Sequence, residues 1–230
     1  MGRNRCSLCI RLNSTILSRE CSMKTNSSGT GLLVALVYGP ALFAVLIVLH
    51  LQDAGFSFAT HMVCSLAVGR PIHRMLFWVA AWGMALLHVP FLLRWPAVVR
   101  SIGGNTRGTL LFRIAGAVFV LGFVLFPIFA LDPGNIVSYR IHQVIASLYF
   151  PACAVIAVVP WINLHGSERG TAVFGVASLV WMASCAAFVV PFVVFAPSAP
   201  PYPAWVNVLN WVFLVCYGLW AIVYGVFLVR

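Results

Sequence analysis

The chain has 230 residues, of which 62% are hydrophobic and only 8% are charged, and its mean hydropathy is +1.01. An ordinary soluble domain carries about 25% charged residues. A water-soluble globule of this length could not hide so much apolar surface in its core. The composition therefore excludes a soluble enzyme, a nucleic-acid-binding domain and a disordered chain, and it indicates a polytopic membrane protein.

The first 30 residues are polar, basic and rich in Ser, Asn and Thr, and they lack hydrophobic periodicity. We expect a flexible cytoplasmic tail over 1–30, followed by a transmembrane domain over 31–230. Translation can start at Met1 or at Met23, since Met23 leads directly into an apolar run. The Cys6-x-x-Cys9 pair is half of a zinc or redox signature, and no second pair follows it, which disfavours metal binding in the tail.

Six stretches are long and apolar enough to cross the hydrocarbon core, which takes about 20 residues in a helix. They are apolar all round, whereas the strands of a membrane barrel would alternate in polarity. The sequence therefore predicts an all-α, six-helix transmembrane bundle. The predicted spans are Gly31–Leu51, Met75–Trp95, Leu110–Leu131, Ile141–Ile162, Thr171–Ala196 and Trp205–Val229.

The basic residues predict the orientation, because Lys and Arg concentrate on the cytoplasmic side of membranes. With the N-terminus inside, 11 basic residues lie on the inner side and 3 on the outer side, out of 14 in all. Of these, 13 are arginines, and this bias fits a GC-rich bacterial genome. We expect a multi-pass protein of a bacterial cytoplasmic membrane with both termini in the cytoplasm. The outer three are Arg70, Arg74 and Arg140.

Polar residues collect in the predicted outer loops. The first loop, 52–71, is too apolar in its middle to be freely solvated, so we expect it to fold back as a re-entrant or interfacial segment. It carries Asp53, His61 and Ser65, and the second outer loop adds Asp132 and His142. These five residues are the candidate catalytic residues.

His61, Asp132 and His142 are also of the ligand types that bind zinc, which would lower the pKa of a bound water for hydrolysis. With Ser65 nearby, this suggests a metal-dependent hydrolase that acts on a lipid or cell-envelope substrate. The alternative is structural: Asp132-Pro133-Gly134 is ordinary turn chemistry, and Asp53 can pair with an arginine. No HxxxH or HxxEH spacing places two ligands on one helix face, which favours the structural interpretation and no cofactor.

The sequence disfavours two further functions, haem binding and transport. Haem ligation needs facing histidines inside helices, and His88 lies near the inner end of its span while His165 lies in an inner loop. A small transporter usually carries an acidic residue at mid-membrane or an internal repeat, and the sequence offers neither sign.

The Ser65-Leu66-Ala67-Val68-Gly69 element in a short first outer loop resembles an uncharacterised six-helix membrane family of bacteria and archaea, the domain-of-unknown-function family numbered 998. Phe126-Pro127, Asp132-Pro133-Gly134 and His142 are similar to that family's pattern, and the resemblance covers about residues 35–228. The family often has an Asp shortly before the loop serine, where this chain has His61 and Met62. It is distantly similar to the DRAM and Sfk membrane proteins, which implies a lipid- or membrane-organising role and no established activity.

These observations favour a non-enzymatic membrane protein that is structural or associated with lipid. Its expected partners are membrane lipids and, beyond them, another helix bundle or a second copy of the chain. A metal-dependent hydrolase and a small transporter remain the alternatives.

Overall fold

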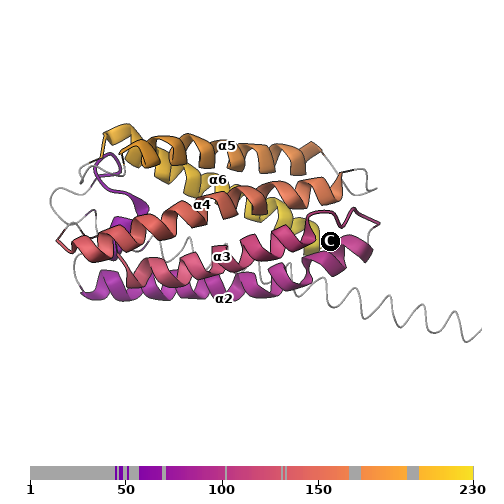
Figure 1. The fold of residues 1–230 in the computed structure, drawn as a ribbon, viewed down its shortest axis with the longest axis horizontal. Helices are drawn as coiled ribbons and strands as arrows, with labels where there is room; N and C mark the ends of the chain where they lie inside the picture. Colours follow the sequence, from indigo (N-terminus) through magenta and orange to yellow (C-terminus); the bar gives the residue numbers. More distant parts are fainter. Residues whose placement is uncertain are drawn as a thin grey trace, which may run out of the picture.

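The computed structural model describes residues 45, 47–48, 51, 57–68, 71–101, 103–130, 132, 134–165, 172–195 and 202–229. This part of the chain holds five α-helices and one short 3₁₀ helix, and none of its residues is in a strand (Figure 1). All five α-helices are long and apolar enough to cross a membrane, which fits an integral membrane protein of the all-α class. The elements are η1 (Val63–Ala67), α2 (Pro71–Ser101), α3 (Thr109–Ile128), α4 (Ile136–Leu164), α5 (Ala172–Phe195) and α6 (Ala204–Val229).

The second to sixth predicted spans are confirmed as helices, with shifted ends. The largest extensions are in α2, which begins four residues before Met75 and ends six after Trp95, and in α4, which begins five before Ile141. A helix of 31 residues is about 46 Å long, longer than the hydrocarbon core of about 30 Å, so parts of α2 lie beyond that core or the helix tilts. The tail 1–30 and nearly all of the first span, 31–51, lie outside the described residues, so the sixth helix stays a prediction.

Consecutive helices run antiparallel and pack as neighbours: α2 on α3, α3 on α4, α4 on α5 and α5 on α6 (Figure 1). The start of α2, the end of α3 and the start of α4 therefore meet at one end of the bundle, which we call the cap end. The opposite end carries Arg94, Arg100, Arg107 and Arg113, and we call it the arginine end.

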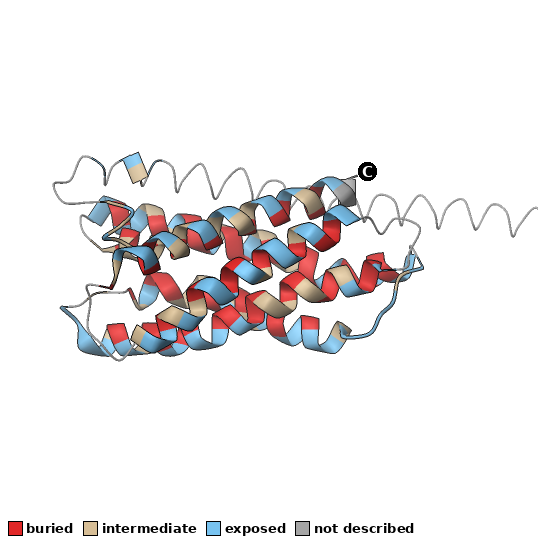
Figure 2. Ribbon diagram, turned by 90° about the horizontal axis from the view of Figure 1, so that it is seen from above, coloured by how far each residue is buried: buried red, intermediate tan, exposed pale blue. Residues whose placement is uncertain are grey.

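Aromatic side chains fill the core between the helices. Trp95, Trp181 and Trp220 are among the largest fully buried side chains. Rings connect α2 to α6, since the ring centroid of Trp95 lies 5.9 Å from that of Tyr224. Buried residues lie on the inward sides of the helices and exposed residues on the outward sides (Figure 2). Leucine and valine are among the exposed residues of every spanning helix, so the exposed surface is apolar. This arrangement suits a lipid environment, where an exposed apolar face carries no penalty.

The segment 57–68 folds back onto the cap end, as predicted for the first loop. Its helix η1 packs against α2 and α3, and the side chains of Leu66 and Ala67 are 0% exposed. This segment, which we call the cap, closes one end of the bundle.

Candidate functional site

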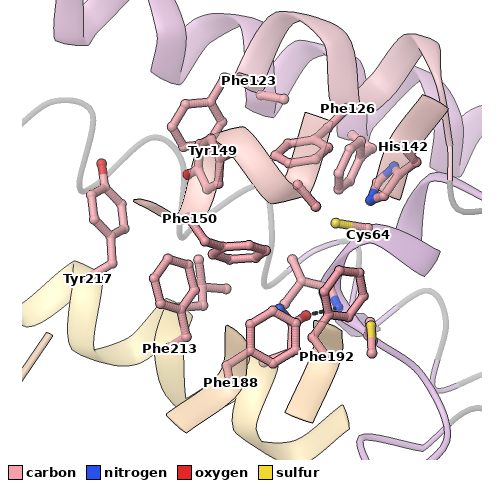
Figure 3. Close-up of a pocket in the computed structure, with 17 residues that line it drawn as sticks. Cys64, Phe123, Phe126, His142, Tyr149, Phe150, Phe188, Phe192, Phe213 and Tyr217 are labelled. Carbon is pink, nitrogen blue, oxygen red and sulfur yellow. Dashed lines mark hydrogen bonds between the residues drawn. The ribbon is translucent and has the colours of Figure 1, made fainter. Parts of the chain in front are cut away.

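A cavity of about 80 Å³ lies inside the bundle beneath the cap (Figure 3). Side chains from η1 and from all five spanning helices line it, so it exists only in the assembled bundle. Seven of the lining residues are phenylalanines: Phe77, Phe123, Phe126, Phe150, Phe188, Phe192 and Phe213. Such a wall favours an apolar occupant.

The aromatic rings hold one another in place. Phe150 of α4 makes edge contacts with Phe188 of α5 and Phe213 of α6, at centroid distances of 4.9 Å and 5.3 Å. Tyr149, the residue before Phe150, stacks on Phe119 of α3 at a centroid distance of 5.3 Å. Because each ring contacts a ring on a neighbouring helix, the wall of the cavity is fixed by packing between helices.

His142 adds an imidazole to this largely apolar wall. It lies six residues inside α4, is only 3% exposed, and its Nδ1 is 2.6 Å from the carbonyl oxygen of Phe129. A carbonyl only accepts hydrogen bonds, so Nδ1 carries the proton and, in the neutral ring, Nε2 is an acceptor. Nε2 has no hydrogen-bond partner among the described residues. The ring therefore offers an occupant of the cavity one hydrogen-bond acceptor.

His88 differs from His142, because both of its ring nitrogens are used. Its Nδ1 is 2.7 Å from the carbonyl oxygen of Met84, and its Nε2 accepts from the hydroxyl of Tyr217. The same donor argument assigns the proton to Nδ1. With Nε2 engaged by Tyr217, His88 connects α2 to α6 and has no nitrogen left to bind haem iron.

Three side chains of α6 fasten the cap. Asn210 Oδ1 accepts from the backbone N–H of Val63 at 2.8 Å, and Asn207 Nδ2 donates to the carbonyl of Ala59 at 2.8 Å. Trp211 Nε1 donates to the carbonyl of His61, also at 2.8 Å. Residues three and four apart share a helix face, so one stripe of α6 satisfies the backbone of the cap.

Sequence reasoning missed this stripe. Its signal is the pair Asn207 and Asn210 within an otherwise apolar span, since polar side chains inside a membrane span are expensive and face a polar partner. Both asparagines are buried in the structure.

The two predicted loop residues, His61 and Ser65, both bond within the cap. His61 Nδ1 lies 2.7 Å from the hydroxyl of Thr60, and Ser65 Oγ donates to the carbonyl of Met62 at 2.6 Å. The hydroxyl of Ser65 is thus bonded to the backbone and not to a base, whereas an activated nucleophile bonds to a base.

Asp132 makes the turn that the structural interpretation predicted. Its Oδ1 accepts from the backbone N–H of Gly134 at 2.9 Å, and its carbonyl accepts from Asn135 at 3.1 Å. The side chain of Asn135 then accepts from the N–H of Ser138 and caps the start of α4. Asp132 therefore shapes the connection between α3 and α4.

The structure does not bring the predicted zinc ligands together. Within the described part of the chain, no three His, Cys, Asp or Glu side chains, and so not His61, Asp132 and His142, are grouped to hold a metal ion. Asp53, the fifth candidate, lies outside the described residues. A zinc site that includes Asp53 stays a prediction.

Cys64 lies in the cap and lines the cavity. Removal of the thiol from water raises its pKa from the usual range to about 12. At neutral pH the side chain is therefore a protonated, weakly polar lining group and not a thiolate nucleophile.

No family model, curated protein or solved structure matches this chain.

Proposed function

We propose that this integral membrane protein is non-enzymatic and lipid-associated, and that it binds an apolar alcohol in the aromatic cavity. One observation carries the proposal: a wall rich in phenylalanines that includes His142, whose Nε2 has no hydrogen-bond partner among the described residues. A hydrocarbon body fits the wall, and a hydroxyl group supplies the donor that the acceptor requires.

The size of the cavity limits how much of such a ligand enters. An engineered cavity of about 150 Å³ binds benzene. The cavity here, at about 80 Å³, takes the hydroxyl end and a few carbons of a longer molecule. Ser65, bonded to the backbone, and Cys64, held as a thiol, support binding in preference to catalysis.

The family, the location and the assembly are part of this proposal. The Ser65–Gly69 element, Phe126-Pro127 and Asp132-Pro133-Gly134 support membership of the family numbered 998. The excess of arginines at one end supports a cytoplasmic location of that end, and the bias toward arginine, 13 of 14 basic residues, supports a bacterial membrane. Lipids are the proposed partners, with a second copy or another bundle as a further one.

Photolabelling tests the cavity directly. The purified protein is labelled in detergent with an octanol that carries a diazirine, and the labelled peptides are identified by mass spectrometry. We expect saturable labelling of cavity residues such as Tyr149. Unlabelled octanol should compete about fivefold better than octane, since one hydrogen bond contributes about 1 kcal/mol.

Two variants and one control test the aromatic wall and the His142 acceptor separately. Ala146→Leu fills the cavity and should abolish the labelling, whereas Ala187→Leu adds the same side chain on the exposed face of α5 and should leave it unchanged. His142→Phe keeps an aromatic ring and should remove the preference for octanol over octane. Labelling that does not saturate, or that survives Ala146→Leu, would contradict the proposal.

A further inference from the structure

A second hollow lies away from the cavity, on the outer surface between α2 and α3. It is a groove of about 680 Å³ lined by Leu93 and Val89 of α2 and by one face of α3. The α3 residues include Arg113, Gly116, Ala117 and Val124, which follow the three-and-four spacing of a helix face. The groove forms because Gly116 and Ala117 have little or no side chain and leave a hollow between the larger residues that line it.

The groove has a charged end and an apolar length. Arg113 is exposed and lies one turn inside the start of α3, at the arginine end. From Arg113 the lining continues to Val124 through apolar residues only, and Leu93 and Leu121 beside it are 66% and 53% exposed. A cation at one end of an apolar channel complements an amphipathic anion.

The length of the groove along α3 matches the thickness of one leaflet of the hydrocarbon core. Val124 lies eleven positions after Arg113, which corresponds to a rise of about 16 Å along the helix. Half of the hydrocarbon core is about 15 Å thick. With Arg113 at the headgroup level, the apolar lining therefore runs through the depth that one acyl chain occupies.

The charge around Arg113 favours an anionic headgroup. Arg94, Arg100 and Arg107 lie at the same end, and the only described acidic residue, Asp132, lies at the cap end. The other three acidic residues, Glu20, Asp53 and Glu168, lie outside the described residues.

We propose that this groove binds one anionic phospholipid of the leaflet at the arginine end, with its phosphate at Arg113 and an acyl chain along α3. The site shares no lining residue with the aromatic cavity. It therefore depends on the membrane embedding of the bundle and not on the proposed binding of an alcohol.

Native mass spectrometry of the full chain in detergent tests the site, with dioleoyl phosphatidylglycerol as the anionic probe and dioleoyl phosphatidylcholine as the neutral one. We expect the first phosphatidylglycerol to bind about fivefold more tightly, the effect of one arginine near the membrane surface. Arg113→Gln should remove this preference. Arg100→Gln removes the same charge at the same end but outside the groove, so most of the preference should remain.

The acyl-chain half of the site needs its own variant. Ala117→Phe fills the exposed wall of the groove without entering the core, and it should weaken the binding of both lipids. Equal losses in Arg113→Gln and Arg100→Gln, or full binding in Ala117→Phe, would overturn the proposal. Full competition by glycerol phosphate, which has no chain, would also overturn it. A thermal-unfolding midpoint in detergent equal to that of the parent protein shows that each variant is folded, so this site is tested whether or not the cavity binds octanol.

Discussion

At the residue scale, one glycine sets how closely two helices approach beside the cavity. A Cβ atom on Gly122 of α3 would overlap the ring of Tyr149 on α4, which lines the cavity. On Gly116 of the same helix, a Cβ atom would lie 3.0 Å from Cδ2 of Leu92, the mobile end of a flexible side chain. Of these two glycines, Gly122 is therefore the one that no larger residue can replace without displacing a ring.

Gly122→Ala should consequently lower the stability of the bundle. Overpacking costs about 1–3 kcal/mol, which exceeds the gain of about 0.5–1 kcal/mol from replacing a helical glycine by alanine. For Gly116→Ala the two effects should nearly cancel, since the tip of Leu92 can move. Thermal unfolding in detergent measures both, and an equal midpoint for Gly122→Ala and the parent protein would show that the helices do not meet at Tyr149.

At the element scale, the cap depends on α6 for its position. The backbone groups of Ala59, His61 and Val63 are bonded to side chains of α6, and the residues of each pair are 147 to 150 positions apart in the chain. A polar backbone group that is buried without a partner is costly. Loss of one α6 side chain should therefore loosen the cap as a unit.

The alkylation rate of Cys64, which depends on the pKa of its thiol, measures this loosening. With the pKa raised to about 12, the thiolate is the minor form throughout the neutral range. A rise in pH removes the proton, so the alkylation rate of Cys64 should increase about tenfold per pH unit up to about pH 11. The alkylation rate of an ordinary thiol, in contrast, stops rising near pH 9. The measurement uses iodoacetamide and a variant in which Cys64 is the only cysteine left of seven.

In the same background, Asn210→Leu removes the acceptor for Val63 and should increase the alkylation rate at pH 8 at least tenfold, because an opened cap lets water reach the thiol. Asn163→Leu is the matched control. Asn163 is also a buried asparagine, but it binds the backbone of Arg107 at the arginine end. The same increase in both variants would mean that general unfolding, not release of the cap, exposes Cys64.

At the scale of the whole molecule, the charge distribution predicts how the bundle sits in the membrane. Four described arginines lie at the arginine end, and two, Arg74 and Arg140, lie at the cap end. The cytoplasmic side carries the excess of basic residues. We infer that the connection between α2 and α3 faces the cytoplasm and that the cap faces outward.

Reporter fusions test this orientation and the sixth span together. Fusions at Gly103 and at the C-terminus should be cytoplasmic, and a fusion at Gly134 should be external. A cytoplasmic N-terminus requires that 31–51 crosses the membrane once, because the chain must reach the cap on the outer side. If the N-terminus is external while Gly103 is cytoplasmic, the six-span prediction is refuted. If Gly103 is external, the predicted orientation is refuted.

The sequence by itself determined the membrane class, the five described spans and the turn at Asp132 and Gly134. Each of these follows from a short stretch of chain: about 20 apolar residues make a span, and an Asp followed by Pro-Gly makes a turn. The cap that folds back could also be predicted, since the middle of the first loop is too apolar to be freely solvated.

Only the tertiary structure decided which face of each helix points inward. Membrane helices are apolar all round, so hydrophobic periodicity does not separate Phe150, which faces the cavity, from Leu148, which faces outward. The acceptor role of His142 depends on a carbonyl 13 residues away, and the cap depends on α6 at the far end of the chain. Local patterns determine the spans, whereas the cavity and the groove arise from contacts between helices. In lipid these contacts depend on close packing and on hydrogen bonds between helices, neither of which the apolar pattern of a single span encodes.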